Sequence, residues 1–306
     1  MSGEHQKPAP TIPKLIAFNH HRMPHWKLIL SYDGTHFHGW QVQPGLATIQ
    51  GTLAQTLHHL TGETVLPQGS GRTDAGVHAL AQVTSFSLEA NIPPENLQRA
   101  LNRALPPSIR ILSAEIVPET FHARHSAIGK TYEYRIFQRR TGSAETRVPP
   151  ISRTWRSGLP QSPEETTERI CPPFLAPYVW DCRWNLDPEP MQEAAALLLG
   201  THDFTSFAAA DPDLTQRQKM VFPNTVKMLK VSTIIHKNER LIYTVSGPGF
   251  LHHMVRNIVG TLAEVGRKAL IPKDIIRILE ARDRSAAGPT APASGLFLQS
   301  VDYPQT

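Results

Sequence analysis

The chain has 306 residues, 40% of them hydrophobic and 19% charged, a globular composition sufficient for one large or two ordinary domains. Its net charge of +5 suits a polyanionic partner without establishing one, because many soluble enzymes carry such an excess. Cys171 and Cys182 form no C-x-x-C pair, and no apolar run approaches the length of a membrane span. We therefore expect free thiols, a reducing compartment and a cytoplasmic protein without membrane association.

The first part of the chain predicts an extension followed by an α+β domain. Residues 1–23 lack both a secretory apolar core and an Arg-rich amphipathic pattern, so we expect a disordered extension, with translation starting at Met1 or Met23. Residues 24–125 follow as the N-terminal domain. Periodicity, caps and breakers within them predict strands at 26–32, 64–69, 80–88 and 109–117 and helices at 48–62 and 93–105.

The second part, residues 126–306, predicts a C-terminal α+β domain with the same order of elements. The expected strands are 130–138, 225–235, 240–247 and 296–303, and the expected helices are 191–200, 250–269 and 272–283. This doubled order predicts an α+β fold of two ferredoxin-like (RRM-like) β-α-β-β-α-β halves, with largely antiparallel sheets and helices on one side. Residues 139–180, rich in Pro, Ser, Thr and charge, predict a flexible insertion whose tail, with Phe174, Tyr178 and Trp180, docks onto the body.

The chemistry centres on a glycine-flanked loop, GSGRTDAGVHA (69–79), which holds a single carboxylate, Asp74. An isolated Arg72-x-Asp74 pair is more often a surface ion pair than a site. An Asp is ionised at pH 7, so it is a poor general acid but suits attack on an electrophilic carbon or proton abstraction. Ordinary glycosides need a second, protonated acid for departure, whereas uracil leaves as a delocalised anion.

Six segments in order resemble the tRNA pseudouridine synthase A (TruA) family. SGRTDAGVHA resembles its catalytic signature. The other five are SYDGTHFHGWQVQP (31–44), FHARHSAIGKTYEYRI (121–136), GTHDFTSF (200–207), GPGFLHHMVRNIVGTLAEVG (247–266) and ASGLFLQSVDYP (293–304). Together they extend from about Trp26 to Pro304. The resemblance implies a pseudouridine synthase fold and isomerisation of uridine to pseudouridine at positions 38, 39 and 40 of the tRNA anticodon stem-loop.

The resemblance also implies roles for five residues. Asp74 is the catalytic aspartate, acting on C1′, on the base or on a ribose proton to give a glycal. Arg72 pairs with it or helps open the RNA, Tyr132 stacks on the uracil and takes part in removing the C5 proton, Arg256 holds the aspartate, and Leu296 is an apolar wall. No cofactor or metal is implied, and the partners are tRNA, through its anticodon arm, and a second copy in a homodimer. Without the resemblance, Tyr132 and Leu296 read as sheet core and Arg256 as a helix-edge residue with a buried stem.

Two other functions fit parts of the sequence. A catalytically silent RNA-binding protein suits the scaffold, but the RNP1 aromatic signature of RRM domains is absent. A metal hydrolase is suggested by THFH, HARH and the pair at 252–253, yet no H-E-x-x-H or Cys/His finger spacing occurs, so we expect no metal centre. His78 and His253 are instead expected to line the RNA cleft.

Overall fold

The computed structural model describes residues 23–139, 169–210, 224–237 and 240–304. The expected N-terminal extension, its start at Met1 or Met23, and most of the expected insertion lie outside these ranges, so those predictions are untested. No helix in the described ranges is long and apolar enough to cross a membrane. The division into domains at residue 125 also stays a prediction.

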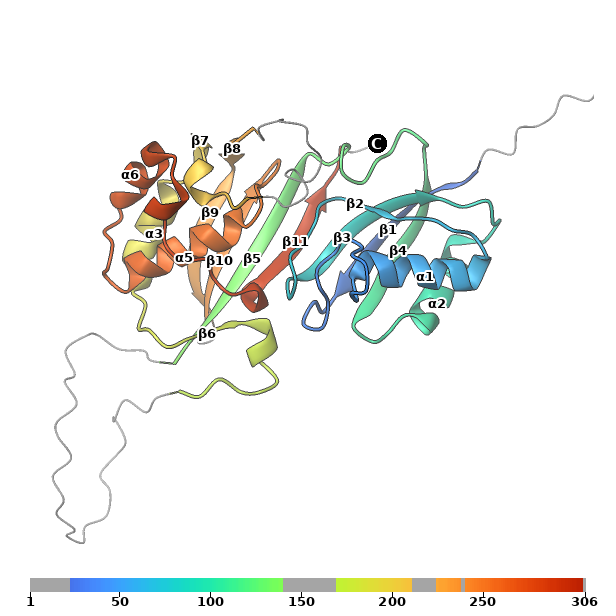
Figure 1. Ribbon diagram of the computed structural model, residues 1–306, viewed down its shortest axis with the longest axis horizontal. Coiled ribbons are helices and arrows are strands. Elements are labelled where there is room, and N and C mark those ends of the chain that lie inside the picture. The colour runs from blue at the N-terminus through green and yellow to red at the C-terminus, as the bar shows by residue number, and fades with distance from the viewer. Residues whose placement is uncertain (1–22, 140–168, 211–223, 238–239, 305–306) are drawn as a thin grey trace, which may run out of the picture.

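The described elements mix helices with runs of consecutive strands, as expected of an α+β chain. In order they are β1 (His25–Tyr32), α1 (Ile49–Thr61), β2 (Gln68–Gly69), β3 (His78–Ser87), α2 (Pro94–Ala104), β4 (Ile109–Val117), β5 (Gly129–Gln138), β6 (Trp180–Cys182), α3 (Pro188–Ala196), β7 (Gly200–Asp203), β8 (Val226–Leu229), β9 (Val231–Lys237), β10 (Arg240–Gly247), α5 (Met254–Gly266), α6 (Asp274–Ala281) and β11 (Leu296–Asp302). Figure 1 shows α1 and α2 at one end of the molecule and α3, α5 and α6 at the other.

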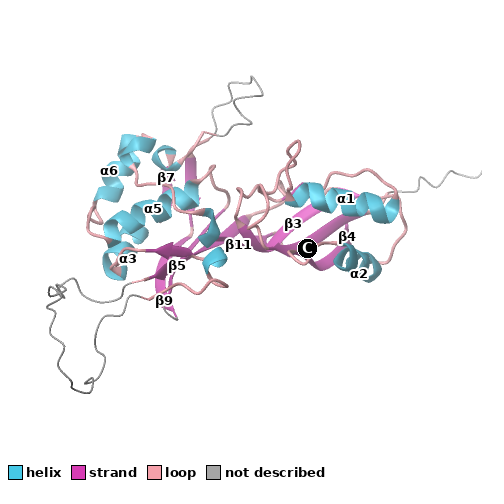
Figure 2. Ribbon diagram, turned by 60° about the horizontal axis from the view of Figure 1, so that its bottom comes forward, coloured by secondary structure: helices cyan, strands magenta, loops and turns pink. Residues whose placement is uncertain are grey.

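One mostly antiparallel sheet connects the two ends, in the order β4-β1-β3-β11-β5-β10-β9. Its middle is the parallel pair β3–β11, in which His78 lies opposite Phe297 and Ala79 opposite Leu298. The described strands therefore form a single continuous sheet through both halves, with β7 and β8 as a separate pair (Figure 2). The sequence predicted a sheet in each half and left open whether the two are continuous. The ferredoxin-like character of each half stays a prediction.

Capping residues and hydrophobic alternation in the sequence predicted several element boundaries correctly. The Thr48 side chain accepts a hydrogen bond from the Gly51 N–H at the start of α1, and Gly62, at φ 76°, ends the helix. The burial of β1 alternates strictly, so that Trp26, Leu28, Leu30 and Tyr32 face the core with the apolar sides of α1 and α2.

Other boundaries differ from the sequence prediction. The expected strand 225–235 is broken at Lys230, whose N–H bonds to Ser246, so β8 leaves the main sheet and pairs with β7. Helix α3 lies earlier than expected because Asp187 caps it and Pro188 opens it. The expected helix 250–269 begins only at Met254, since His253 has a left-handed backbone, φ 58°, that no helix continues through. The segment before α5 is consequently a loop.

Candidate active site

The loop that carries Asp74 joins β2 to β3 and rests on the segment that follows β1. The Trp40 N–H donates to the Thr73 carbonyl at 3.0 Å, and the Gly76 N–H donates to the Phe37 carbonyl at 3.2 Å. Gly39 has φ +83°, and a Cβ there would stand 2.5 Å from the Thr73 carbonyl oxygen. The glycine is thus required twice, for its backbone conformation and for close approach. This contact explains physically why the YDGT and GWQ segments accompany the catalytic loop.

Buried polar groups hold the loop from below. The hydroxyls of Tyr32 and Thr73 are hydrogen-bonded at 2.8 Å, and Gln82 donates from Nε2 to the Gly71 carbonyl at 3.0 Å while its Oε1 accepts from Ser70. Burial raises the pKa of Tyr32 to about 12, so its phenol is neutral. Because all these partners are satisfied inside the protein, the network fixes the loop in one conformation.

Lys130 on β5 adds a charged contact to the same loop. Its ammonium donates to the Ser70 carbonyl at 2.7 Å. Burial, with the charge of Arg124, lowers the pKa of Lys130 to about 8. The sequence prediction did not single out Lys130 or Gln82, because a polar residue within a strand carries no local sign of what it contacts.

Asp74 meets Arg256 from the first turn of α5. Arg256 Nη1 donates to Asp74 Oδ2 at 2.9 Å, and its Nε donates to the Ala291 carbonyl at 2.8 Å. The Asp74 and Arg256 side chains are 22% and 16% exposed. The guanidinium is thus held at two points and aims the carboxylate, which stays accessible to a substrate. This is the contact that the resemblance implied for Arg256; its part in catalysis stays a prediction.

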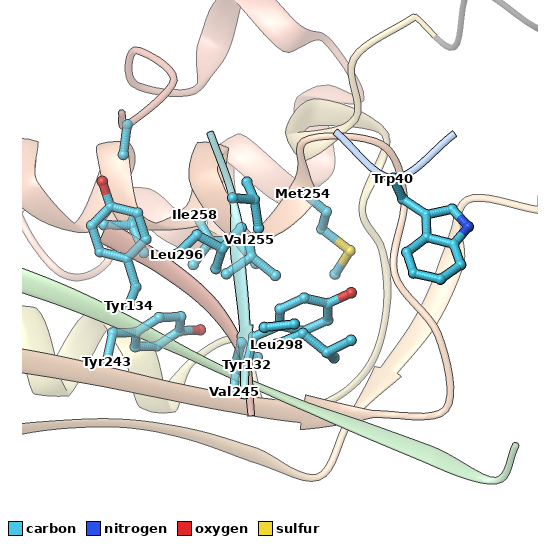
Figure 3. Close-up of a cluster of buried hydrophobic side chains, with 14 of the residues drawn as sticks. Trp40, Tyr132, Tyr134, Tyr243, Val245, Met254, Val255, Ile258, Leu296 and Leu298 are labelled. Atoms are coloured by element: carbon cyan, nitrogen blue, oxygen red, sulfur yellow. The ribbon is translucent and has the colours of Figure 1, made fainter. Parts of the chain in front are cut away.

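Arg72 and Leu296, two other predicted site residues, differ in solvent exposure. Arg72 is exposed, whereas Leu296 is only 6% exposed and lies opposite Tyr134 across the β11–β5 pair. Figure 3 shows Leu296 beside Ile258 among core side chains. The position of Leu296 is that of a core residue, and its predicted role as a wall for the base, like the RNA contact of Arg72, remains to be tested.

Tyr132 lies deeper than a freely accessible stacking platform. It is 8% exposed, and its ring meets Phe250 edge-on with the centroids 5.0 Å apart. Figure 3 shows it projecting from β5 toward Met254 at the start of α5. Burial raises the pKa of its phenol well above the usual range, and the nearby Tyr32 and Asp74 add to the shift. The phenol is therefore protonated at neutral pH, and within the described residues its hydroxyl has no hydrogen-bond partner.

His252 and His253 approach Asp74 from the loop before α5. Their Nε2 atoms lie 3.6 Å from Asp74 Oδ1 and 3.3 Å from Asp74 Oδ2, respectively, and the two rings are 4.0 Å apart. The sequence prediction placed His253 near the RNA cleft but did not connect either histidine with Asp74. The only sequence signal was the adjacent pair itself.

His78 is buried, contrary to the expectation that it lines the RNA cleft. It is 1% exposed, accepts a hydrogen bond from the Gly34 N–H at Nδ1, and contacts the Pro177 carbonyl at 3.0 Å through Nε2. The tail of the expected insertion docks there: the Tyr178 hydroxyl donates to Asp33, and β6, which begins at Trp180, pairs with β5. Phe174, in contrast, is 82% exposed and does not dock. The buried hydrogen-bonding partners of its two ring nitrogens explain the presence of His78 better than RNA contact does.

Comparison with known proteins identifies the family. The sequence profile described as tRNA pseudouridine synthase matches residues 28–126 and 194–304, most of the chain. The chain belongs to the tRNA pseudouridine synthase family. The matched ranges contain Asp74, Arg72, Arg256 and Leu296, while Tyr132 falls between them.

Curated members of the tRNA pseudouridine synthase family match nearly end to end. The protein called tRNA pseudouridine synthase A from Solibacter usitatus is 46% identical over 278 residues, which cover 90% of this chain and 98% of the relative. Its namesakes from Moorella thermoacetica and Lacticaseibacillus casei are 41% and 40% identical, each covering 92% of this chain and the whole of the relative. The similarity therefore extends beyond the matched profile, across residue 132.

Proposed function

We propose that this chain, an isomerase acting on tRNA, converts uridine to pseudouridine at positions 38, 39 and 40 of the anticodon stem-loop. The observation that supports the chemistry best is the surroundings of Asp74. It is a partly exposed carboxylate on a rigid loop, and the charged groups that contact it, Arg256, His252 and His253, are all basic. Within the part of the chain that the structure describes, no second carboxylic acid contacts Asp74, as a uracil leaving group permits.

The reaction exchanges one glycosidic bond for another and moves one proton off C5 and one onto N1. The C1′–N1 bond of uridine is cleaved, the uracil rotates, and C1′ joins C5; the C5 proton is lost and N1 gains a proton from solvent. Asp74 acts either as the nucleophile or as the base that gives a glycal, and both routes need the carboxylate that Arg256 orients. Arg72, exposed two residues before Asp74, is proposed to contact the opened RNA strand, and Leu296 to support the wall behind the base.

Tyr132 is proposed to stack on the flipped uracil and to pass on the C5 proton. A phenol that takes a proton from C5 must first lose its own, and the raised pKa of Tyr132 makes this costly in the free enzyme. Asp74 is near enough for its charge to contribute to that shift. We therefore assign the hydroxyl to proton transfer between C5 and the carboxylate or solvent, with the ring as the stacking surface.

The enzyme is proposed to act as a homodimer that holds one tRNA across both subunits, in the cytoplasm and without a cofactor. The support is the family resemblance. Light scattering of the RNA-free protein should give twice the chain mass of 34.0 kDa. A particle of the single-chain mass at micromolar concentration would contradict the dimer without affecting the chemistry.

A map of modified positions tests the function directly. Carbodiimide or mass-spectrometric mapping of tRNA from cells with and without the protein should show pseudouridine at 38, 39 and 40 lost only in its absence. Restoration by the wild-type gene, and not by Asp74→Asn, ties the modification to this site. An unchanged map, with tRNA still bound by the purified protein, would favour the catalytically silent RNA-binding alternative.

A further inference from the structure

Three side chains at the active site converge as metal ligands do. One oxygen of Asp74 and one ring nitrogen each of His252 and His253 lie within 4.8 Å of one another. Zn²⁺ bonds of 2.0–2.1 Å in tetrahedral geometry place ligand atoms roughly 3.3–3.4 Å apart. His252 Nε2 lies 3.6 Å from Asp74 Oδ1 and His253 Nε2 lies 3.3 Å from Asp74 Oδ2, so each ring nitrogen is near that spacing from one carboxylate oxygen, a different one in each case. We propose that Asp74, His252 and His253 bind Zn²⁺, or a similar borderline transition metal, and that the bound ion switches the enzyme off.

The orientation of His252 supports a metal ligand rather than a hydrogen bond. Its Nδ1 lies 2.9 Å from the Ala210 carbonyl, which accepts only, so Nδ1 carries the proton. In the neutral tautomer with that proton, the lone pair of Nε2 is on the side of Asp74 Oδ1, 3.6 Å away, a separation too long for a hydrogen bond. A ring nitrogen fixed by a backbone carbonyl on its other side is the usual arrangement of histidine metal ligands.

The surroundings and the backbone conformation of His253 also suit a metal ligand. Burial lowers its pKa; Asp74 opposes this shift, whereas His252, Arg256 and Arg284 add to it. A neutral imidazole is the form that binds metals, and its Nε2 lies 3.3 Å from Asp74 Oδ2. Its left-handed backbone, φ 58°, is uncommon for a residue other than glycine and places the side chain against Asp74. A strained backbone kept at the centre of a site indicates a functional constraint.

Two arginines limit the affinity. Arg256 donates to Asp74 Oδ2, but Oδ1, which faces His252, stays available because a carboxylate accepts several partners. The positive charges of Arg256 and Arg284 oppose a cation, so we expect micromolar binding, weaker than a structural zinc site. The Asp74, His252 and His253 side chains are 22–29% exposed, which leaves an entry path for a hydrated ion.

Zinc is expected to inhibit the reaction because it binds a carboxylate oxygen of Asp74, the proposed catalytic residue. Asp74 is a poorer nucleophile and a poorer base while one of its oxygens is a zinc ligand, because the cation neutralises the carboxylate charge. This part of the inference rests on the proposed function, whereas binding itself does not. Zinc is thus expected to act as a reversible inhibitor and not as a cofactor.

Binding is tested by titrating ZnCl₂ into the untagged, full-length protein by calorimetry in excess MgCl₂. The matched control is His125, which forms a second histidine pair with His122: the rings are 4.3 Å apart, and the charged groups that act on His122 are all basic. Wild type and His125→Asn should show the same micromolar site, and His252→Asn should bind at least about tenfold more weakly. Equal affinity in His252→Asn, or no binding at millimolar zinc, would overturn the site.

Inhibition is tested by tritium release from C5-labelled tRNA, with each variant compared with its own metal-free rate. Zinc should stop wild type and His125→Asn at concentrations that leave His252→Asn active, and EDTA should restore both. Zinc bound without loss of the wild-type rate would refute the inhibitory role. If metal-free wild type releases no tritium, the proposed function fails, while calorimetry still decides the metal site.

Discussion

Arg256 and Asp74 stand 182 positions apart in the sequence, and their side chains meet at 2.9 Å. The contact exists because β3 and β11 pair in the middle of the sheet and bring the loop before β3 against the start of α5. A second contact, from Arg256 Nε to Ala291, stops the guanidinium from following the carboxylate wherever it moves. The carboxylate is thus oriented by a group that is itself anchored.

Arg256→Lys should separate charge from orientation. Lysine keeps the positive charge but cannot donate to Asp74 and Ala291 together in the fork geometry of a guanidinium. We expect turnover to fall on the order of a hundredfold, because a misplaced reacting group costs about that much. tRNA affinity should change little. Single-turnover tritium release and filter binding measure the two.

The control for Arg256 is Arg277→Lys, at an arginine that is 60% exposed and paired with Asp274 on the surface of α6. It should keep the wild-type rate, since exposed ion pairs contribute little. Similar losses in both variants would mean that the Arg256 contact with Asp74 does not position the carboxylate.

Two glycines of positive φ offer a matched test of the support under the loop. Gly39 has φ +83° and touches Thr73, whereas Gly45 has φ +73° and nothing within 4 Å of an added Cβ. Alanine at either costs roughly 1–2 kcal/mol of backbone strain, so urea unfolding should show that loss in both. Gly39→Ala must also displace the Thr73 carbonyl and with it Asp74. We expect turnover to collapse in Gly39→Ala alone, and equal turnover in the two would contradict this role of Gly39.

The sequence predicted what local signals encode. Thr48 and Gly62 marked the ends of α1 correctly because capping depends on the few residues around each end. The start of α5 was misplaced, since the left-handed conformation of His253 is imposed by its surroundings and has no sequence signature. Asp74 was found because its loop resembles a family signature, and not because a lone R-x-D is distinctive.

Local sequence signals could not predict the contacts that join parts of the site far apart in the sequence. Lys130 belongs to a strand, and the alternating pattern of a strand predicts only on which face of the sheet a side chain lies. Its hydrogen bond to the Ser70 carbonyl depends on β5 lying near the β2–β3 loop. The joining of the two halves into one sheet depends on pairing between β3 and β11, which no spacing rule predicts. Contacts of this kind need the folded chain.

The lowered pKa of Lys130 should make the free energy of unfolding depend measurably on pH. Its pKa is lowered by burial from 10.5 to about 8, so between these values the unfolded chain binds more protons than the folded chain, and the free energy of unfolding rises with pH. Below about pH 8 both states are protonated, and the burial penalty is constant.

Lys130→Met should remove this rise. Urea unfolding of wild type should give a larger gain between about pH 8 and about pH 10 than unfolding of the variant. Lys268→Met, at a lysine that is 69% exposed, is the control and should follow wild type. If all three proteins gain equally, the half-buried Lys130 ammonium does not titrate in this window.

For Tyr132 the ring and the hydroxyl make separable contributions. Tyr132→Phe keeps the stacking face and should bind tRNA normally while losing turnover, if the hydroxyl relays the C5 proton. Tyr132→Ala should also weaken capture of the flipped uridine, by about 1–3 kcal/mol for a base–aromatic stack. Binding by fluorescence anisotropy and tritium release distinguish the two, and wild-type kinetics in both variants would return Tyr132 to a purely structural role.

Asp74 is the residue on which the proposed chemistry depends, and two substitutions test it differently. Asp74→Asn keeps the size of the side chain but removes its charge and its nucleophile. It should fold normally and bind tRNA within a few-fold of wild type, because phosphate contacts dominate affinity. Tritium release should fall below detection, since the charged groups that contact Asp74 in the described ranges are basic and none of them replaces an anionic catalyst.

Asp74→Glu keeps the charge and moves it. The extra methylene displaces the carboxylate by about an ångström from the position that Arg256 and the loop define, enough to cost on the order of a hundredfold in turnover. Residual activity in Asp74→Glu with none in Asp74→Asn would show that both the anion and its placement matter. Release near the wild-type rate in Asp74→Asn would instead make the loop structural, because a neutral amide can neither form the covalent intermediate nor take the proton.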